Sequence, residues 1–182
     1  MNHRVWAGPL DSSNEVIQRA RQLALSILAP SEAQLIHGLK LHEDSLVFES
    51  YGFAPRAAID GDAFRAAAES GASDSELVDL REEMSMTRPA TSETERAEFF
   101  EAFQAAGVTC IFQNVGEEGN DPLRLIKRLS RFTFTTDMLR GELTKAVRPD
   151  DVVAAKQEGK LCLAFTTNGV PLRQHWQNTR DE

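Results

Sequence analysis

The chain has 182 residues, 28 acidic against 20 basic side chains, and a formal net charge of -8. This length allows one domain with a sizeable hydrophobic core, and the negative charge argues against binding to nucleic acid or to anionic membranes, which favour basic surfaces. No apolar stretch approaches the ~20 residues that span a bilayer, and the N-terminus lacks the apolar core of a signal peptide. We therefore expect a cytoplasmic protein.

The first predicted element is a helix that begins after Ser12 and ends near Leu28. Ser12 and Glu15 form a capping-box pattern, and Pro30 stops the helix. Apolar residues recur at helical spacing, so we expect the helix to bury one stripe, which consists of Val16, Ala20, Leu23 and Ile27.

The next segments are less regular. The apolar run 35–41 is interpreted as a buried strand. Residues 45–59 contain turn-forming glycine and proline and are predicted to be an irregular loop. Two short helices are predicted at 60–69 and 73–86.

The second half alternates helices with apolar strands. Helices are predicted at 92–106, 121–140 and 149–158, and strands at 108–112, 143–147 and 161–166. Strands that are apolar throughout and alternate with helices indicate a parallel sheet covered on both faces. The sequence therefore predicts the α/β class.

Two groups of charged residues and two cysteines have competing interpretations. Basic residues on the helix 121–140 are predicted to form a solvated outer face rather than a phosphate site; they are Arg124, Lys127, Arg128 and Arg131. Glu117 and Glu118 are predicted to help cap that helix rather than to contact a substrate amine. Cys110 and Cys162 lie in apolar runs, which favours buried free thiols in a reducing compartment over a disulfide between neighbouring strands.

His42 and Asp44 come directly after the predicted strand 35–41. In an extended chain residues two apart point to the same side, so these two side chains could converge on one metal ion while Glu43 points away. Histidine and carboxylates are common zinc ligands. The alternative is that the triplet is the polar start of a loop.

Three segments resemble, in order and spacing, the membrane dipeptidase family of zinc peptidases: the triplet 42–44 and residues 107–118 and 150–160. The resemblance implies a parallel-stranded (β/α)8 (TIM) barrel with metal ligands at the carboxyl ends of its strands. His42 and Asp44 match the first-strand His-x-Asp ligand pair of the family. Two zinc ions in that family activate a water that attacks the peptide bond of a dipeptide. The resemblance thus implies a metallo-dipeptidase with a small peptide substrate.

The chain departs from the family pattern after the strand 161–166. Active relatives carry a glutamate there that bridges both metals, whereas this chain has Thr167 and Asn168, which cannot supply a carboxylate. The family's other ligands come from later strands, and His175 lies in a polar linker. The first expectation is a zinc dipeptidase; the alternative is a catalytically inactive, dipeptidase-like barrel that acts as a binding or assembly module.

We expect a single domain over residues 1–182, the N-terminal part of such a barrel, with residues 1–33 as a helical extension. Residues 174–182 resemble the opening of a helix, so we expect a partial chain. A full barrel needs ~250 residues. A self-contained small α/β domain and a homodimer both stay open at this point.

Overall fold

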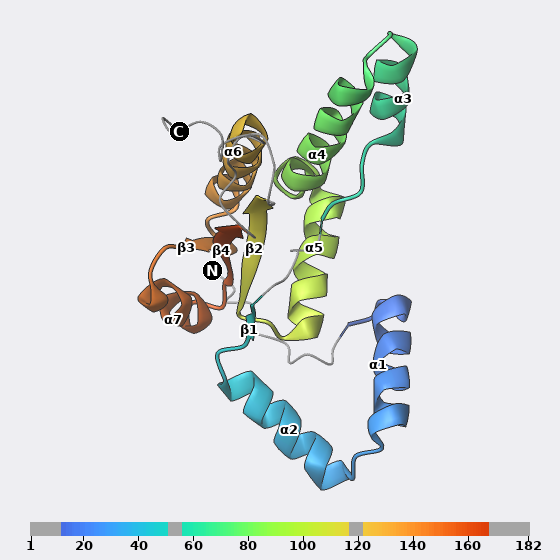
Figure 1. Cartoon of the computed structure of the whole chain (residues 1–182). Coiled ribbons are helices and arrows are strands. Elements are labelled where there is room, and N and C mark those ends of the chain that lie inside the picture. Colours follow the sequence, from blue (N-terminus) through green and yellow to red (C-terminus); the bar gives the residue numbers. More distant parts are fainter. Residues whose placement is uncertain (1–11, 51–55, 117–121, 168–182) are drawn as a thin grey trace, which may run out of the picture.

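The computed structural model describes residues 12–50, 56–116 and 122–167 (Figure 1). The elements are α1 (Glu15–Leu28), α2 (Glu32–Asp44), β1 (Phe48–Glu49), α3 (Gly61–Glu69), α4 (Asp74–Thr91), α5 (Glu93–Ala106), β2 (Cys110–Gly116), α6 (Pro122–Met138), β3 (Leu143–Ala146), α7 (Pro149–Gln157) and β4 (Leu161–Thr167). The strands form one parallel sheet in the order β1-β2-β4-β3. The predicted α/β class and parallel sheet are confirmed. Within these residues no helix is both long and apolar enough to cross a membrane.

Most helix ends follow the local signals in the sequence. Ser73 and Glu76 form the predicted capping box of α4, and Gly107 ends α5 in the left-handed conformation with φ 63°. α1 begins at Glu15, two residues later than predicted, because its cap is Asn14 rather than Ser12; the Asn14 side chain accepts hydrogen bonds from the backbone of Val16 and Ile17.

The predicted strand 35–41 is wrong, because these residues belong to α2. A capping box starts that helix: Ser31 N donates to the side chain of Gln34 at 2.9 Å, and Gln34 N donates to Ser31 Oγ at 3.3 Å. The first strand is instead β1, which lies within the predicted loop 45–59. Val47, just before β1, joins the sheet by accepting hydrogen bonds from the backbone of Thr109 and Cys110.

The main hydrophobic core lies between one face of the sheet and α4, α5 and α6 (Figure 1). Alternate residues of β2 and β4 point into it, because successive side chains of a strand face opposite sides of a sheet. Its buried members are Met86, Phe99, Phe100, Phe103, Ile111, Val115, Phe132, Leu139, Leu143, Leu161 and Leu163.

On the opposite face of the sheet, α7 covers the amino-terminal ends of the strands. Val152 and Ala155 of this helix pack against Cys110 and Cys162. Further along the strands, Phe112 is only half-buried. The expectation that both faces are covered therefore holds only in part for the described residues.

α4 passes through Pro89 without ending. Proline has no backbone N–H, so the carbonyl of Ser85, four residues earlier, loses its helical donor. The backbone N–H of Ala57 takes that place, at 3.1 Å. The segment that leads into α3 is thereby attached to α4, and the Ser85 carbonyl keeps a hydrogen-bond partner.

The α6 basic stripe, defined as Arg124, Lys127, Arg128 and Arg131, pairs with carboxylates of α4. Glu82 accepts hydrogen bonds from Arg124 and Arg128, and Asp79 accepts from Lys127 and Arg131, both at 2.9 Å. The side chains of Arg128 and Arg131 are 4% and 9% exposed. The prediction of a solvated outer face is wrong for these two arginines, which lie in the contact between α4 and α6.

This contact should make stability sensitive to acid. Burial alone would raise the pKa of Glu82, but hydrogen bonds from Arg128 and Arg124 outweigh it and lower the pKa from 4.5 to about 2. A carboxylate with a lowered pKa stabilises the fold above its unfolded pKa, and this contribution is lost as pH falls through the folded value. We expect the melting temperature to fall between pH 4.5 and about 2, and to fall less in Glu82→Gln. If calorimetry gave the same dependence of melting temperature on pH for the unmodified protein and for Glu82→Gln, this assignment would be contradicted.

α1 and α2 project from the rest of the molecule (Figure 1) and contain no fully buried residue. The apolar stripe of α1, predicted to be buried, is exposed: Val16 is 74%, Leu23 61% and Ile27 74% accessible. The start of α1 is held by Ser12, whose hydroxyl donates to Glu101 of α5 at 2.7 Å. The predicted burial of this stripe is therefore wrong within the described chain.

Candidate functional site

The predicted metal ligands His42 and Asp44 lie in the last turn of α2, not at the end of a strand. In a helix with 3.6 residues per turn, side chains two apart lie on nearly opposite sides. Asp44 contacts Lys40 Nζ at 2.9 Å, and this hydrogen bond, followed by that of Glu43, raises the pKa of Lys40. The geometry from which the ligand pair was predicted is therefore absent.

No group of three or more His, Cys, Asp or Glu side chains is placed to hold a metal ion in residues 12–50, 56–116 and 122–167. Nδ1 of His42 is buried and has no hydrogen-bond partner in those ranges. Structural zinc takes four ligands, and catalytic zinc takes three from the protein. A zinc ion at His42 would thus need ligands from residues outside these ranges.

The first strand carries no His-x-Asp pair at its carboxyl end. β1 ends at Glu49, and the sequence continues with Ser50, Tyr51, Gly52 and Phe53, which include neither histidine nor a further carboxylate. The position that the resemblance assigns to the first two metal ligands is therefore filled by other residue types.

Thr167, predicted at the bridging-ligand position, closes β4 opposite Gly116 of β2. A side chain at Gly116 would meet Leu125 Cδ1 at 2.9 Å and Thr167 Cβ at 3.3 Å, so glycine allows β2 to approach both. Thr167 offers a hydroxyl rather than a carboxylate. Asn168 lies outside the described residues, as do Glu117, Glu118 and His175.

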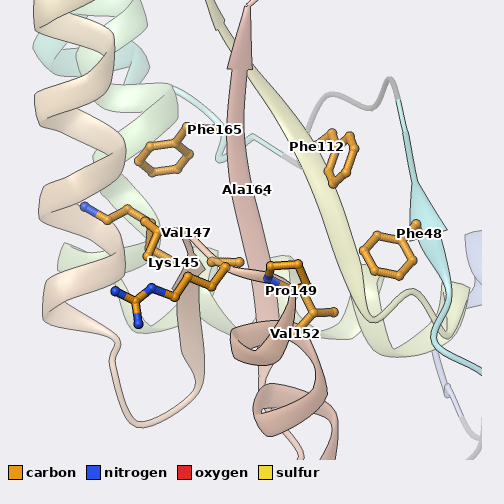
Figure 2. Close-up of a pocket in the computed structure, with 10 residues that line it drawn as sticks. Phe48, Phe112, Lys145, Val147, Pro149, Val152, Ala164 and Phe165 are labelled. Carbon is orange, nitrogen blue, oxygen red and sulfur yellow. The ribbon is translucent and has the colours of Figure 1, made fainter.

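Beyond α7, the sheet face bounds a cavity of about 610 Å³ (Figure 2). Phe48 and Phe112 lie on one side of Ala164, and Phe165 and Lys145 lie on the other, where Phe165 packs against the main core. Phe48 and Phe112 meet edge to face with ring centroids 5.9 Å apart. Val147, Pro149 and Val152 complete most of the apolar wall.

The two charged residues in this lining, Lys145 and Arg148, are both basic. Nζ of Lys145 lies 5.8 Å from the centre of the Phe165 ring, within the range of a cation–π contact. The loop beside them is fixed by Asp151, whose carboxylate accepts hydrogen bonds from the backbone of Val147 and Arg148, both at 2.8 Å. These two bonds lower the pKa of Asp151. Phe165 packs against the main core, so the Lys145 ammonium lies toward that face of the sheet. The cavity beside Phe112 thus combines apolar walls with one basic side chain, Arg148, in its lining.

Cys110 and Cys162 lie directly opposite each other on β2 and β4, fully buried and free, as predicted. The hydrogen bond to Cys110 and burial both raise the pKa of the Cys162 thiol. A protonated, buried thiol is a poor nucleophile. This pair therefore offers no support for thiol catalysis.

Sequence reasoning missed the cavity. The apolar character of β2 and β4 predicted that helices cover both faces of the sheet. It could not show that α7 covers only part of one face. The available signal was Arg148, a basic residue immediately after the predicted strand 143–147. That signal indicates positive charge near a strand end but not a cavity.

Over the described ranges the fold is that of an α/β protein with a four-stranded parallel sheet. Comparisons with protein-family models, with curated proteins and with solved structures found no match to this chain.

Proposed function

We propose that this protein binds a short peptide in the cavity and does not hydrolyse it. This is the binding-module alternative that the resemblance to membrane dipeptidases leaves open. The observation that carries it is the cavity of about 610 Å³, with apolar walls and the basic residue Arg148 in its lining. Small-molecule sites typically occupy roughly 300–1,000 Å³ and combine apolar walls with a few polar groups.

The lining favours one orientation of the peptide. An apolar side chain fits beside Phe48 and Phe112, whose rings already pack edge to face. The terminal carboxylate fits near Arg148, because a cation attracts it there. A dipeptide with a C-terminal aromatic residue, such as Gly-Phe, has both features.

The competing proposal is a zinc dipeptidase, supported by the resemblance of segments 107–118 and 150–160. It also requires that the sheet be part of a (β/α)8 barrel, in which neighbouring strands follow one another along the chain. Here β4 lies between β2 and β3, so β3 would have to be an addition to the barrel. This proposal also requires one or two zinc ions, and most of their ligands would have to come from residues outside the described ranges.

The test combines calorimetric titration with metal analysis of the zinc-supplemented protein. We expect Gly-Phe to bind without being hydrolysed, and zinc to be present at less than one ion per chain. The C-terminal amide of Gly-Phe should bind roughly tenfold more weakly, because it lacks the carboxylate. A hydrogen bond to a charged group contributes about 1.5–3 kcal/mol, and a tenfold change in affinity corresponds to about 1.4 kcal/mol. Val147→Asp should weaken Gly-Phe binding at least as much, because it brings a negative charge to an exposed cavity position.

Val78→Asp is the matched control, since Val78 is also exposed but lies on α4, outside the cavity lining. It should bind Gly-Phe as the unmodified protein does. Zinc-dependent cleavage of Gly-Phe would establish the dipeptidase proposal instead. Absence of binding, or equal binding by the Val147→Asp variant, would exclude the cavity as the peptide site.

A further inference from the structure

α1 presents an apolar stripe that nothing in the described chain covers. Val16, Leu23 and Ile27 are 61–74% accessible, and Ala20 between them is exposed as well. Helices of about 12–15 residues are only marginally stable in water without packing on an apolar face. α1 has 14 residues and no fully buried one, so its own stripe lacks the packing that normally stabilises such a helix.

The spacing of the stripe is that of a helix-pairing seam. Val16, Ala20, Leu23 and Ile27 follow one another at intervals of four, three and four residues, as the a and d positions of a coiled coil do. α2 differs, because its exposed Ile36 and Leu41 are five residues apart and lie on different faces.

The seam is complementary to itself in the antiparallel direction. Two α1 helices related by a two-fold axis would set Leu23 of one copy against Ala20 of the other, and Val16 against Ile27. The Leu23–Ala20 pairs at the centre then set a large side chain against a small one, which permits close packing there.

Charge opposes contact through this helix only weakly. The chain carries a net charge of -8, so two copies repel each other overall. α1 is an exception, with Glu15 as its single acidic residue against Arg19 and Arg21. Two copies can therefore meet at α1 with little acidic repulsion.

We propose that α1 is a dimerisation helix whose occupant is α1 of a second copy, packed antiparallel about a two-fold axis. One short helix pair buries less than the roughly 1,200 Å² of a standard interface, so the dimer is weak, with a dissociation constant on the order of micromolar. This surface is separate from the sheet-face cavity, and the proposal stands or falls independently of peptide binding.

Sedimentation of the full chain over roughly 1–100 µM, a range that brackets micromolar affinity, tests the proposal. We expect a monomer–dimer equilibrium, and a rise of at least about tenfold in the dissociation constant for Leu23→Asp. Leu41→Asp is the matched control, because Leu41 is 59% exposed on α2 and should leave the equilibrium unchanged. A monomer throughout, or the same dissociation constant in Leu23→Asp, would overturn the proposal, as would loss of the dimer in Leu41→Asp.

A thiol-specific bismaleimide tests the direction of pairing even if Leu23→Asp unfolds α1. In the antiparallel arrangement the double variant Val16→Cys/Ile27→Cys should cross-link into a dimer, and Val16→Cys alone should not. The native thiols Cys110 and Cys162 are fully buried and should not react. Efficient cross-linking through Val16→Cys alone would overturn the antiparallel arrangement.

Discussion

Glu82→Ala is expected to lower the free energy of unfolding by about 3–5 kcal/mol, the usual cost of removing one partner of a buried ion pair. Glu82 accepts hydrogen bonds from Arg124 and Arg128, and Arg131 Nη1 lies 3.8 Å from its Oε2. The Arg128 side chain is 4% exposed, so without Glu82 its charge is left in a poorly hydrated site. Urea unfolding followed by circular dichroism measures the loss.

Glu83→Ala is the matched control for this prediction. Glu83 neighbours Glu82 on the same helix and lies 3.6 Å from Arg131, but its side chain is 59% exposed. Exposed ion pairs contribute about 0–1 kcal/mol, so this variant should be close to the unmodified protein. Similar losses for both variants would mean that burial does not set the strength of the α4–α6 contact.

The part of the fold set by local signals could be predicted from sequence. Ser73 with Glu76 marked the start of α4, Gly107 marked the end of α5, and the apolar runs marked β2 and β4. Each of these signals acts within one element, through a cap, a backbone conformation or a continuous apolar run.

The failure at residues 35–41 has a local cause as well. The segment is short and rich in leucine, and such runs do not distinguish a strand from a helix by periodicity. Ser31 and Gln34 carried the decisive information, because their capping box begins α2. Once the segment is a helix, His42 and Asp44 no longer share a side, and the candidate metal pair loses its geometric basis.

Other features depend on residues far apart in the chain. The α6 basic stripe looked like a solvated face, since nothing near it in sequence neutralises it; Asp79 and Glu82 come from α4, more than forty residues earlier. The cavity likewise joins Phe48, Phe112 and Ala164 from three strands. Such pairings follow from topology rather than from spacing, so the sequence alone could not reveal them.

Phe103→Ala is expected to cost about 3–5 kcal/mol of unfolding free energy, as large-to-small changes in a closed core do. Phe103 is 1% exposed, and its ring centroid lies 5.0 Å from that of Phe99. Because the main core lies on one face of the sheet, the cavity left there cannot be filled from the α7 side. Leu41→Ala, at a 59% exposed site, should change the unfolding free energy by less than about 0.5 kcal/mol. If calorimetry found that Phe103→Ala lowers the unfolding free energy by less than about 1 kcal/mol, α5 would not be tightly packed against the sheet.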